Sequence, residues 1–260
     1  MGKKIVESEI KAYLDEKVVL YNNPNFIELD PISIPHRYTL KEDIEIAGFL
    51  AATISWGNRR SIVKNGHRML NLLGDSPYDF VMSHNTRQLK RLEGFVHRTF
   101  NHNDYKYFIK ALKHIYINYG GMEQLFKKYS NEESLQPAIH HFKSIFFELP
   151  HQARMTKHIS DPLRGSAAKK INMLLRWLIR KDNKGVDFGL WKSVSPSQLS
   201  CPLDVHSGRM ARELGLLTRK QNDALAVEQL DSSLRILDKK DPVKYDFALF
   251  GLGISGELEH

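Results

Sequence analysis

The chain has 260 residues, of which 42% are hydrophobic and 26% are charged, a composition typical of a globular protein rather than a disordered one. Its formal net charge of +8 fits a polyanionic partner, but it also fits a merely basic soluble surface. The single cysteine, Cys201, excludes an internal disulfide framework, a four-cysteine zinc site and a cysteine-ligated iron–sulfur cluster. No apolar run has the length of a membrane span and no signal peptide is recognisable, so we expect a cytoplasmic protein without a membrane anchor.

Helical periodicity dominates the sequence. It predicts helices at about 5–20, 43–55, 62–74, 77–84, 104–119, 122–129, 135–149, 166–180, 205–214, 223–237 and 242–252. The helix at 43–55 is apolar nearly all round, which predicts a central, buried position. Thr39-x-x-Glu42 is the expected capping box before it. Few segments have a pattern that predicts a β-strand, and the clearest of them is Ile32-Ser33-Ile34.

These elements predict an all-α fold. We expect a single helical domain over residues 1–257, built from two interleaved lobes around a central cleft. The lobes cover approximately 40–150 and 151–257, with 1–39 packing on them. Leu258-Glu259-His260 is interpreted as the remnant of an expression tag.

The positive charge is concentrated in one stretch. Residues 154–184 hold nine lysines and arginines but only two acids, Asp161 and Asp182. Nearly the whole net charge of the protein therefore lies there, and binding several phosphates requires such a local density. A solvated basic helix face is an equally good interpretation of the charge alone.

A possible phosphate site lies within that stretch, at the turn before the helix predicted from Ser166. Gly165 permits the positive φ of a tight turn, and free amides at the helix N-terminus would face a phosphate beside Arg164 and Lys170. The dipole and the neighbouring cation favour a neutral, nucleophilic amine at Lys169. The simpler alternative is that both lysines are ordinary surface residues.

A second segment begins at Asp204 and continues into the helix expected at 205–214. Asp204 is well placed to cap that helix, and capping does not exclude a catalytic role. Arg209 and Arg212 lie three residues apart, so both can face one groove. His206 either contacts phosphate or packs against the protein.

Together these segments resemble the helix–hairpin–helix DNA glycosylase superfamily, which includes endonuclease III and the 8-oxoguanine glycosylases. The hairpin pattern Gly-x-Gly-x-Lys is similar to Gly165-x-Ala167-x-Lys169, and the later aspartate motif is similar to Leu203-Asp204-Val205-His206. The spacing of 35 residues between Lys169 and Asp204 is nearest to that of the archaeal GO glycosylase branch. The whole chain resembles an uncharacterised bacterial family, domain of unknown function 2400, in blocks at 43–49 and 244–250.

The resemblance implies a function and a set of site residues. Lys169 corresponds to the Schiff-base nucleophile and Asp204 to the supporting aspartate, while damaged duplex DNA is the partner. The hairpin, with Arg164, Gly165, Ser166 and Lys170, and the later helix, with His206, Arg209 and Arg212, would contact DNA. In Ser55-Trp56-Gly57-Asn58-Arg59-Arg60, Trp56 could stack on bases, and Asn58 or Arg59 could fill the place of a flipped base. The alternative is that Trp56 belongs to the core and that the arginines are solvated.

Our leading hypothesis is a base-excision DNA glycosylase and abasic-site lyase that removes a damaged base, an oxidised purine being one candidate. It requires no metal or other cofactor, and the single cysteine excludes the iron–sulfur subgroup. The alternative is a non-catalytic nucleic-acid-binding module that keeps the hairpin. Ala167, in place of the family's second glycine, and the long spacing between Lys169 and Asp204 both favour this alternative. An interaction scaffold that binds no nucleic acid is a third possibility. Catalysis requires the Lys169 amine and the Asp204 carboxylate to converge on one cleft.

Overall fold

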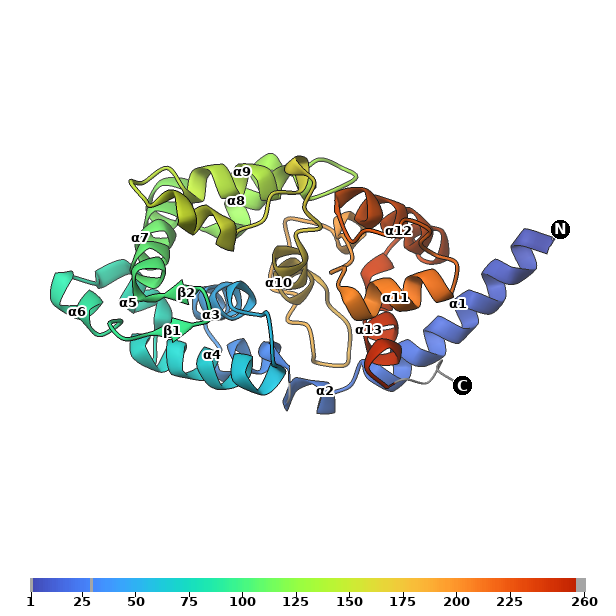
Figure 1. Ribbon diagram of the computed structural model, residues 1–260, viewed down its shortest axis with the longest axis horizontal. Helices are drawn as coiled ribbons and strands as arrows, with labels where there is room; N and C mark the ends of the chain where they lie inside the picture. Colours follow the sequence, from blue (N-terminus) through green and yellow to red (C-terminus); the bar gives the residue numbers. More distant parts are fainter. Residues whose placement is uncertain (1, 29, 256–260) are drawn as a thin grey trace.

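The computed structural model describes residues 2–28 and 30–255 (Figure 1). The expected tag remnant at 258–260 and the end of the expected domain at 257 lie outside the described residues. Helices make up most of the described chain, so the predicted all-α class is confirmed. No helix in residues 2–28 and 30–255 combines the length and the apolar character needed to cross a lipid bilayer.

Each predicted helix has a counterpart in the structure. The α-helices are Gly2–Tyr21 (α1), Asn25–Glu28 (α2), Lys41–Thr53 (α3), Arg59–Leu73 (α4), Pro77–Ser83 (α5), Thr86–Lys90 (α6), His102–Tyr119 (α7), Met122–Tyr129 (α8), Gln136–Phe146 (α9), Lys169–Ile179 (α10), Val205–Glu213 (α11), Ala224–Leu237 (α12) and Tyr245–Ser255 (α13). The 3₁₀ turns are Pro31–Ser33 (η1), Pro35–Arg37 (η2), Ala153–His158 (η3), Pro162–Arg164 (η4), Pro196–Gln198 (η5) and Pro242–Lys244 (η6). Two short antiparallel strands, Val96–His97 (β1) and Phe100–Asn101 (β2), form the hairpin between α6 and α7.

Two local predictions are wrong. The expected strand at Ile32–Ile34 is the 3₁₀ turn η1, because Pro31 opens the turn and the Asp30 side chain accepts a hydrogen bond from the amide of Ile32. The expected capping box at Thr39–Glu42 is not formed. Helix α3 begins at Lys41, so its N-cap is Leu40, which makes no side-chain capping bond.

The helix that carries Lys169 also begins later than predicted, at Lys169 rather than Ser166. Ser166 pairs instead with Asp223 in an isolated antiparallel β-bridge. Ala168, the N-cap residue, has a φ of 46°, in the left-handed region. Three residues after Gly165 are therefore held outside the helix, and Lys169 occupies its first position.

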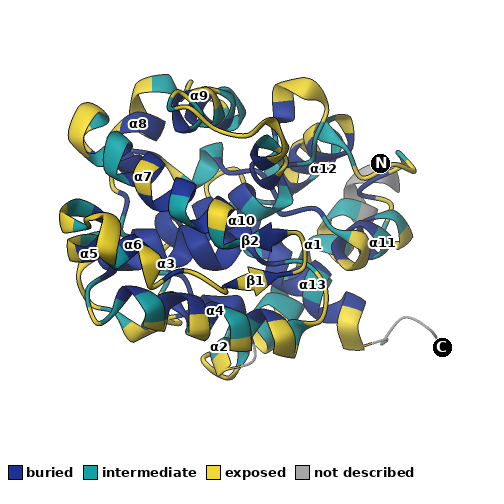
Figure 2. Ribbon diagram, turned by 60° about the vertical axis from the view of Figure 1, so that its left-hand side comes forward, coloured by how far each residue is buried: buried dark blue, intermediate teal, exposed yellow. Residues whose placement is uncertain are grey.

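Buried apolar side chains form two clusters. The larger one extends from η1 through α3 to α10, and α3 is buried along nearly its whole length, as predicted (Figure 2). The second cluster joins α1 to α11, α12 and α13. In Figure 1, helix α10 lies between these two groups of helices, and its buried side chains belong to the larger cluster. The lobe boundary near residue 150 stays a prediction.

Candidate functional site

A cleft of about 680 Å³ opens where the two groups of helices meet. Its wall is formed by the turn between α3 and α4 and by parts of α4, α10, α11 and α13. The side chains that matter most for its chemistry are Trp56, Lys169, Lys170, Asp204, Asp246 and Phe250. Apolar side chains supply most of the remaining surface, as is usual for a ligand site with a few polar groups.

The turn before Lys169 is held in place by residues distant in sequence. Gly165 adopts a φ of 89°, as the sequence predicts, and a methyl group added there would meet nothing within 4 Å. The Gly165 carbonyl accepts a hydrogen bond from the amide of Ala224 at 3.1 Å. The turn is therefore fixed to the start of α12, and α10 begins with the Lys169 amine directed into the cleft.

The two carboxylate oxygens of Asp204 have different partners. Oδ1 accepts hydrogen bonds from the amides of His206 at 2.9 Å and Ser207 at 3.0 Å, so Asp204 is the N-cap of α11. Oδ2 lies 3.4 Å from Nζ of Lys169, an ion-pair distance. The Lys169 and Asp204 side chains are one third and 18% exposed. The cap therefore positions a partly accessible carboxylate against a partly accessible amine in one cleft.

Lys170 has a different environment from its neighbour. Its ammonium donates to the backbone carbonyls of Thr53 at 2.9 Å and His158 at 3.1 Å. It also lies 4.8 Å from the centre of the Trp56 ring. Burial, with a smaller contribution from repulsion by Lys169, lowers the pKa of Lys170 to about 8. A phosphate contact by Lys170 stays a prediction, and its amine already has these partners.

The lowered pKa of Lys170 predicts a pH-dependent stability. Between about pH 8 and about pH 10 the unfolded chain retains the Lys170 proton, whereas the folded chain releases it. The free energy of unfolding therefore increases as the pH rises through this range. The gain is limited to about 1.4 kcal/mol per pH unit. We expect urea unfolding to show that the difference in the free energy of unfolding, parent protein minus Lys170→Met, increases with pH across this range. The same comparison with Lys157→Met, an exposed site, should stay constant; a constant difference for Lys170→Met would contradict the prediction.

Asp246 is another of the three carboxylates in the cleft wall, beside Asp204 and Asp30, and the motif analysis of the sequence does not single it out. It is 5% exposed and forms an ion pair with Arg176. Burial raises the pKa of Asp246 to about 6, against the attraction of Arg176. The sequence signal for this residue is an acid within the otherwise apolar helix α13. Asp246 therefore adds a buried proton-binding group beside Lys169 and Asp204.

The basic stretch at 154–184 is less available to a ligand than its charge suggests. Arg176 and Arg180 are 4% and 2% exposed. Arg176 pairs with Asp187 and Asp246. The partners of Arg180 are Asp182, Asp187 and Asp241. This stretch therefore does not present its whole charge surplus at the turn before Lys169, because acids outside the stretch neutralise its buried arginines. Arg164, whose side chain is 83% exposed, remains beside Gly165.

In the segment after α3, the side chains of Trp56, Asn58 and Arg59 all contact other protein groups. Trp56 lines the cleft, and its ring contacts the His97 ring at 5.1 Å. Asn58 is the N-cap of α4 and accepts from the amide of Ser61. Arg59 also lines the cleft, where it pairs with Asp30 at 2.7 Å and lies against the rings of two phenylalanines, Phe26 and Phe250. A role for Asn58 or Arg59 in place of a flipped base stays a prediction.

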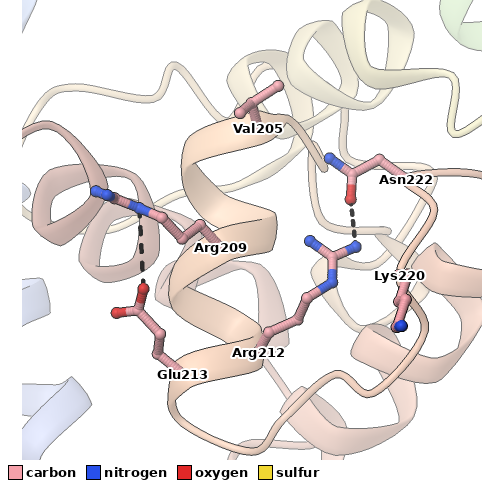
Figure 3. A pocket seen from close by; sticks show the side chains of 6 residues that line it. All are labelled: Val205, Arg209, Arg212, Glu213, Lys220 and Asn222. Atoms are coloured by element: carbon pink, nitrogen blue, oxygen red, sulfur yellow. Dashed lines mark hydrogen bonds and ion pairs between the residues drawn. The ribbon is translucent and has the colours of Figure 1, made fainter.

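Arg209 and Arg212 line one shallow hollow of about 530 Å³ (Figure 3), and neither of them lines the cleft. Arg212 donates to the backbone carbonyl of Arg219 and to the side chain of Asn222. Arg209 donates to the carbonyl of Gly253, which His206 also contacts through Nδ1. The three residues that are predicted to contact DNA, His206, Arg209 and Arg212, thus hold α11 against its neighbours. Their binding to DNA stays a prediction.

In the part of the chain that the structure describes, no three His, Cys, Asp or Glu side chains are grouped so that they could hold a metal ion. The fold and the cleft define an all-α protein with two lysine amines and three carboxylates lining a cleft at the junction of its helical groups. The chain belongs to the family described as Protein of unknown function (DUF2400), whose match covers residues 30–255. No curated protein and no solved structure matches the chain significantly.

Proposed function

We propose that the protein is a base-excision DNA glycosylase with abasic-site lyase activity. The single observation that carries the proposal is the 3.4 Å approach of the Lys169 amine to the Asp204 carboxylate inside a cleft. A nucleophilic amine next to a proton acceptor is what Schiff-base chemistry on a sugar requires. Damaged duplex DNA is the proposed substrate, with an oxidised purine among the candidate lesions.

The proposed reaction begins with the damaged nucleotide flipped into the cleft, because its glycosidic carbon is inaccessible within the base stack. Nζ of neutral Lys169 attacks that carbon while the bond to the base breaks, and the base leaves with the bonding electron pair. Asp204 stabilises the cationic sugar and accepts the proton that the amine loses. Opening of the sugar ring then gives a Schiff base. Loss of a proton from the adjacent carbon expels the 3′ phosphate by β-elimination.

The remainder of the cleft suits an extrahelical base. Trp56 and Phe250 present aromatic rings, and stacking on aromatic side chains is a common way to hold a flipped base. Arg59, which lies against the rings of Phe26 and Phe250, forms an ion pair with Asp30 in the same wall. The buried thiol of Cys201 is compatible with a reducing cytoplasm, where we propose that the protein acts.

Borohydride trapping tests this function. The protein is incubated with duplexes that contain an abasic site, 8-oxoguanine or other damaged bases, and borohydride reduces any Schiff base to a stable covalent adduct. We expect an adduct on at least one of these duplexes. Salt-dependent duplex binding without an adduct on any lesion would contradict the lyase chemistry and favour the non-catalytic binding module. Absence of binding as well would leave the interaction scaffold.

A further inference from the structure

Two residues stand out in the backbone geometry of the described chain. Among residues 2–28 and 30–255, Arg98 and Ala168 are the only non-glycine residues with positive φ, 54° and 46°. Such conformations persist only where the surrounding structure enforces them, and they concentrate at functional sites. Ala168 directly precedes Lys169 at the cleft. Its strain thus already belongs to the proposed active site, whereas that of Arg98 has no role yet.

Arg98 occupies the tip of the hairpin formed by β1 and β2. Only Arg98 and Thr99 separate the two strands, and Val96 pairs with Asn101 across the ladder. Two-residue hairpin turns favour glycine, asparagine or aspartate at the position with positive φ. An arginine there is conformationally costly, so the turn chemistry does not explain this residue.

The Arg98 side chain lies at the edge of the cleft. A methyl group added to Gly57 would come within 2.5 Å of Nη1 of Arg98, so the guanidinium rests directly on Gly57. Gly57 and the adjacent Trp56 both line the cleft. The hairpin itself is held there by His97, which is 3% exposed and packs its ring edge-on against Trp56.

No acid neutralises Arg98. Within the described residues its guanidinium has neither an ion pair nor a side-chain hydrogen bond, and the residue is exposed. Asn58 and Arg59, the residues that the sequence suggests for the place of a flipped base, already have protein partners. The guanidinium of Arg98 is therefore a planar cation without an ion-pair partner in the described part of the chain. Its backbone is fixed in the hairpin, and it lies beside the part of the cleft wall that Trp56 and Gly57 form.

We infer that Arg98 contacts DNA at the damaged nucleotide, at the mouth of the cleft, and that the turn between β1 and β2 is strained because it aims this side chain. The inference rests on the proposed function, since it takes DNA as the ligand. A contact with the flanking backbone would need only a surface lysine or arginine. A guanidinium fixed beside the nucleotide pocket instead predicts a contact that depends on the lesion.

Replacing Arg98 with glycine separates the strain from the contact. Glycine accepts the positive φ, so Arg98→Gly should unfold at the same temperature as the parent protein or higher. The affinity for a duplex with a tetrahydrofuran abasic analogue should fall about tenfold, and the affinity for the undamaged duplex by less than about threefold. Lys239→Gly, which removes an equal charge from an exposed loop, should change the two affinities alike.

The tetrahydrofuran analogue cannot form a Schiff base, so this binding experiment can be interpreted whether or not the parent protein is trapped by borohydride. If trapping fails but Arg98→Gly still weakens binding mainly to the damaged duplex, the lyase chemistry is contradicted and the Arg98 contact is supported. Equal losses of affinity on the two duplexes would overturn the inference and indicate a contact with the flanking backbone. A lower unfolding temperature with unchanged affinities would also overturn it, since Arg98 would then serve packing alone.

Discussion

Replacing Lys169 with glutamine is expected to abolish the borohydride-trapped adduct with abasic DNA. Glutamine has a similar length and polarity, but its amide nitrogen has no nucleophilic lone pair and cannot form a Schiff base. In single-turnover assays, we expect strand cleavage to fall by a factor of about 10³ or more. The Lys169 side chain is one third exposed at the edge of the cleft, so the variant should fold as the parent protein does.

Lys157→Gln is a suitable control for this loss, because Lys157 is exposed on η3 and does not line the cleft. It should leave the adduct unchanged. An adduct that survives Lys169→Gln would contradict the assignment and direct attention to Lys170, the other amine in the cleft wall. Peptide mapping of the trapped product identifies which lysine carries the sugar, and only Lys169 agrees with the proposed chemistry.

The local part of the candidate site could be predicted from the sequence. Asp204 stands immediately before a helical pattern, and short-range capping chemistry placed it correctly at the start of α11. The conformational freedom of glycine predicts a tight turn at Gly165, and Gly165 does adopt positive φ. The existence of the helices followed from apolar periodicity, which depends on neighbouring residues alone.

The rest of the site depends on contacts between distant residues, which no local pattern encodes. Arg176 on α10 and Arg180, the C-cap residue four positions later, resemble a solvated basic face in the sequence. In the structure, acids from other segments, Asp187 and Asp246 among them, enclose them. The delayed start of α10 likewise follows from the pairing of Ser166 with Asp223. Charge counted along the chain therefore overestimates charge available at the surface.

Arg98 illustrates the same limit for a strained residue. The dipeptide Arg98-Thr99 lacks the glycine or asparagine that marks a tight hairpin turn, so sequence patterns gave no reason to expect a turn there. The turn forms because β1 and β2 are anchored by tertiary packing, with His97 against Trp56 and Phe100 against the ring of Phe108. Residues whose conformation disagrees with their local preference are the ones that only a three-dimensional structure can identify.

Replacing Asp204 with asparagine is expected to reduce base release by a factor of about 10² to 10⁴ while leaving stability nearly unchanged. Asparagine is as good an N-cap as aspartate, so its carbonyl oxygen can still accept the bonds from the amides of His206 and Ser207. Its amide group, however, would face Lys169 in place of Oδ2 and could neither take the amine's proton nor balance a cationic sugar. The rate is measured in single-turnover assays and the stability by urea unfolding.

Asp204→Ala separates the two roles, because alanine removes the cap as well as the charge. We expect it to lose as much activity as the asparagine variant and to lose about 1 kcal/mol of stability in addition. Full activity in Asp204→Asn would mean that the carboxylate serves only to cap α11. The 3.4 Å distance to Lys169 would then be a structural ion pair. Loss of activity in both variants, with loss of stability only in alanine, would establish that one oxygen of Asp204 holds the helix and the other acts on the substrate.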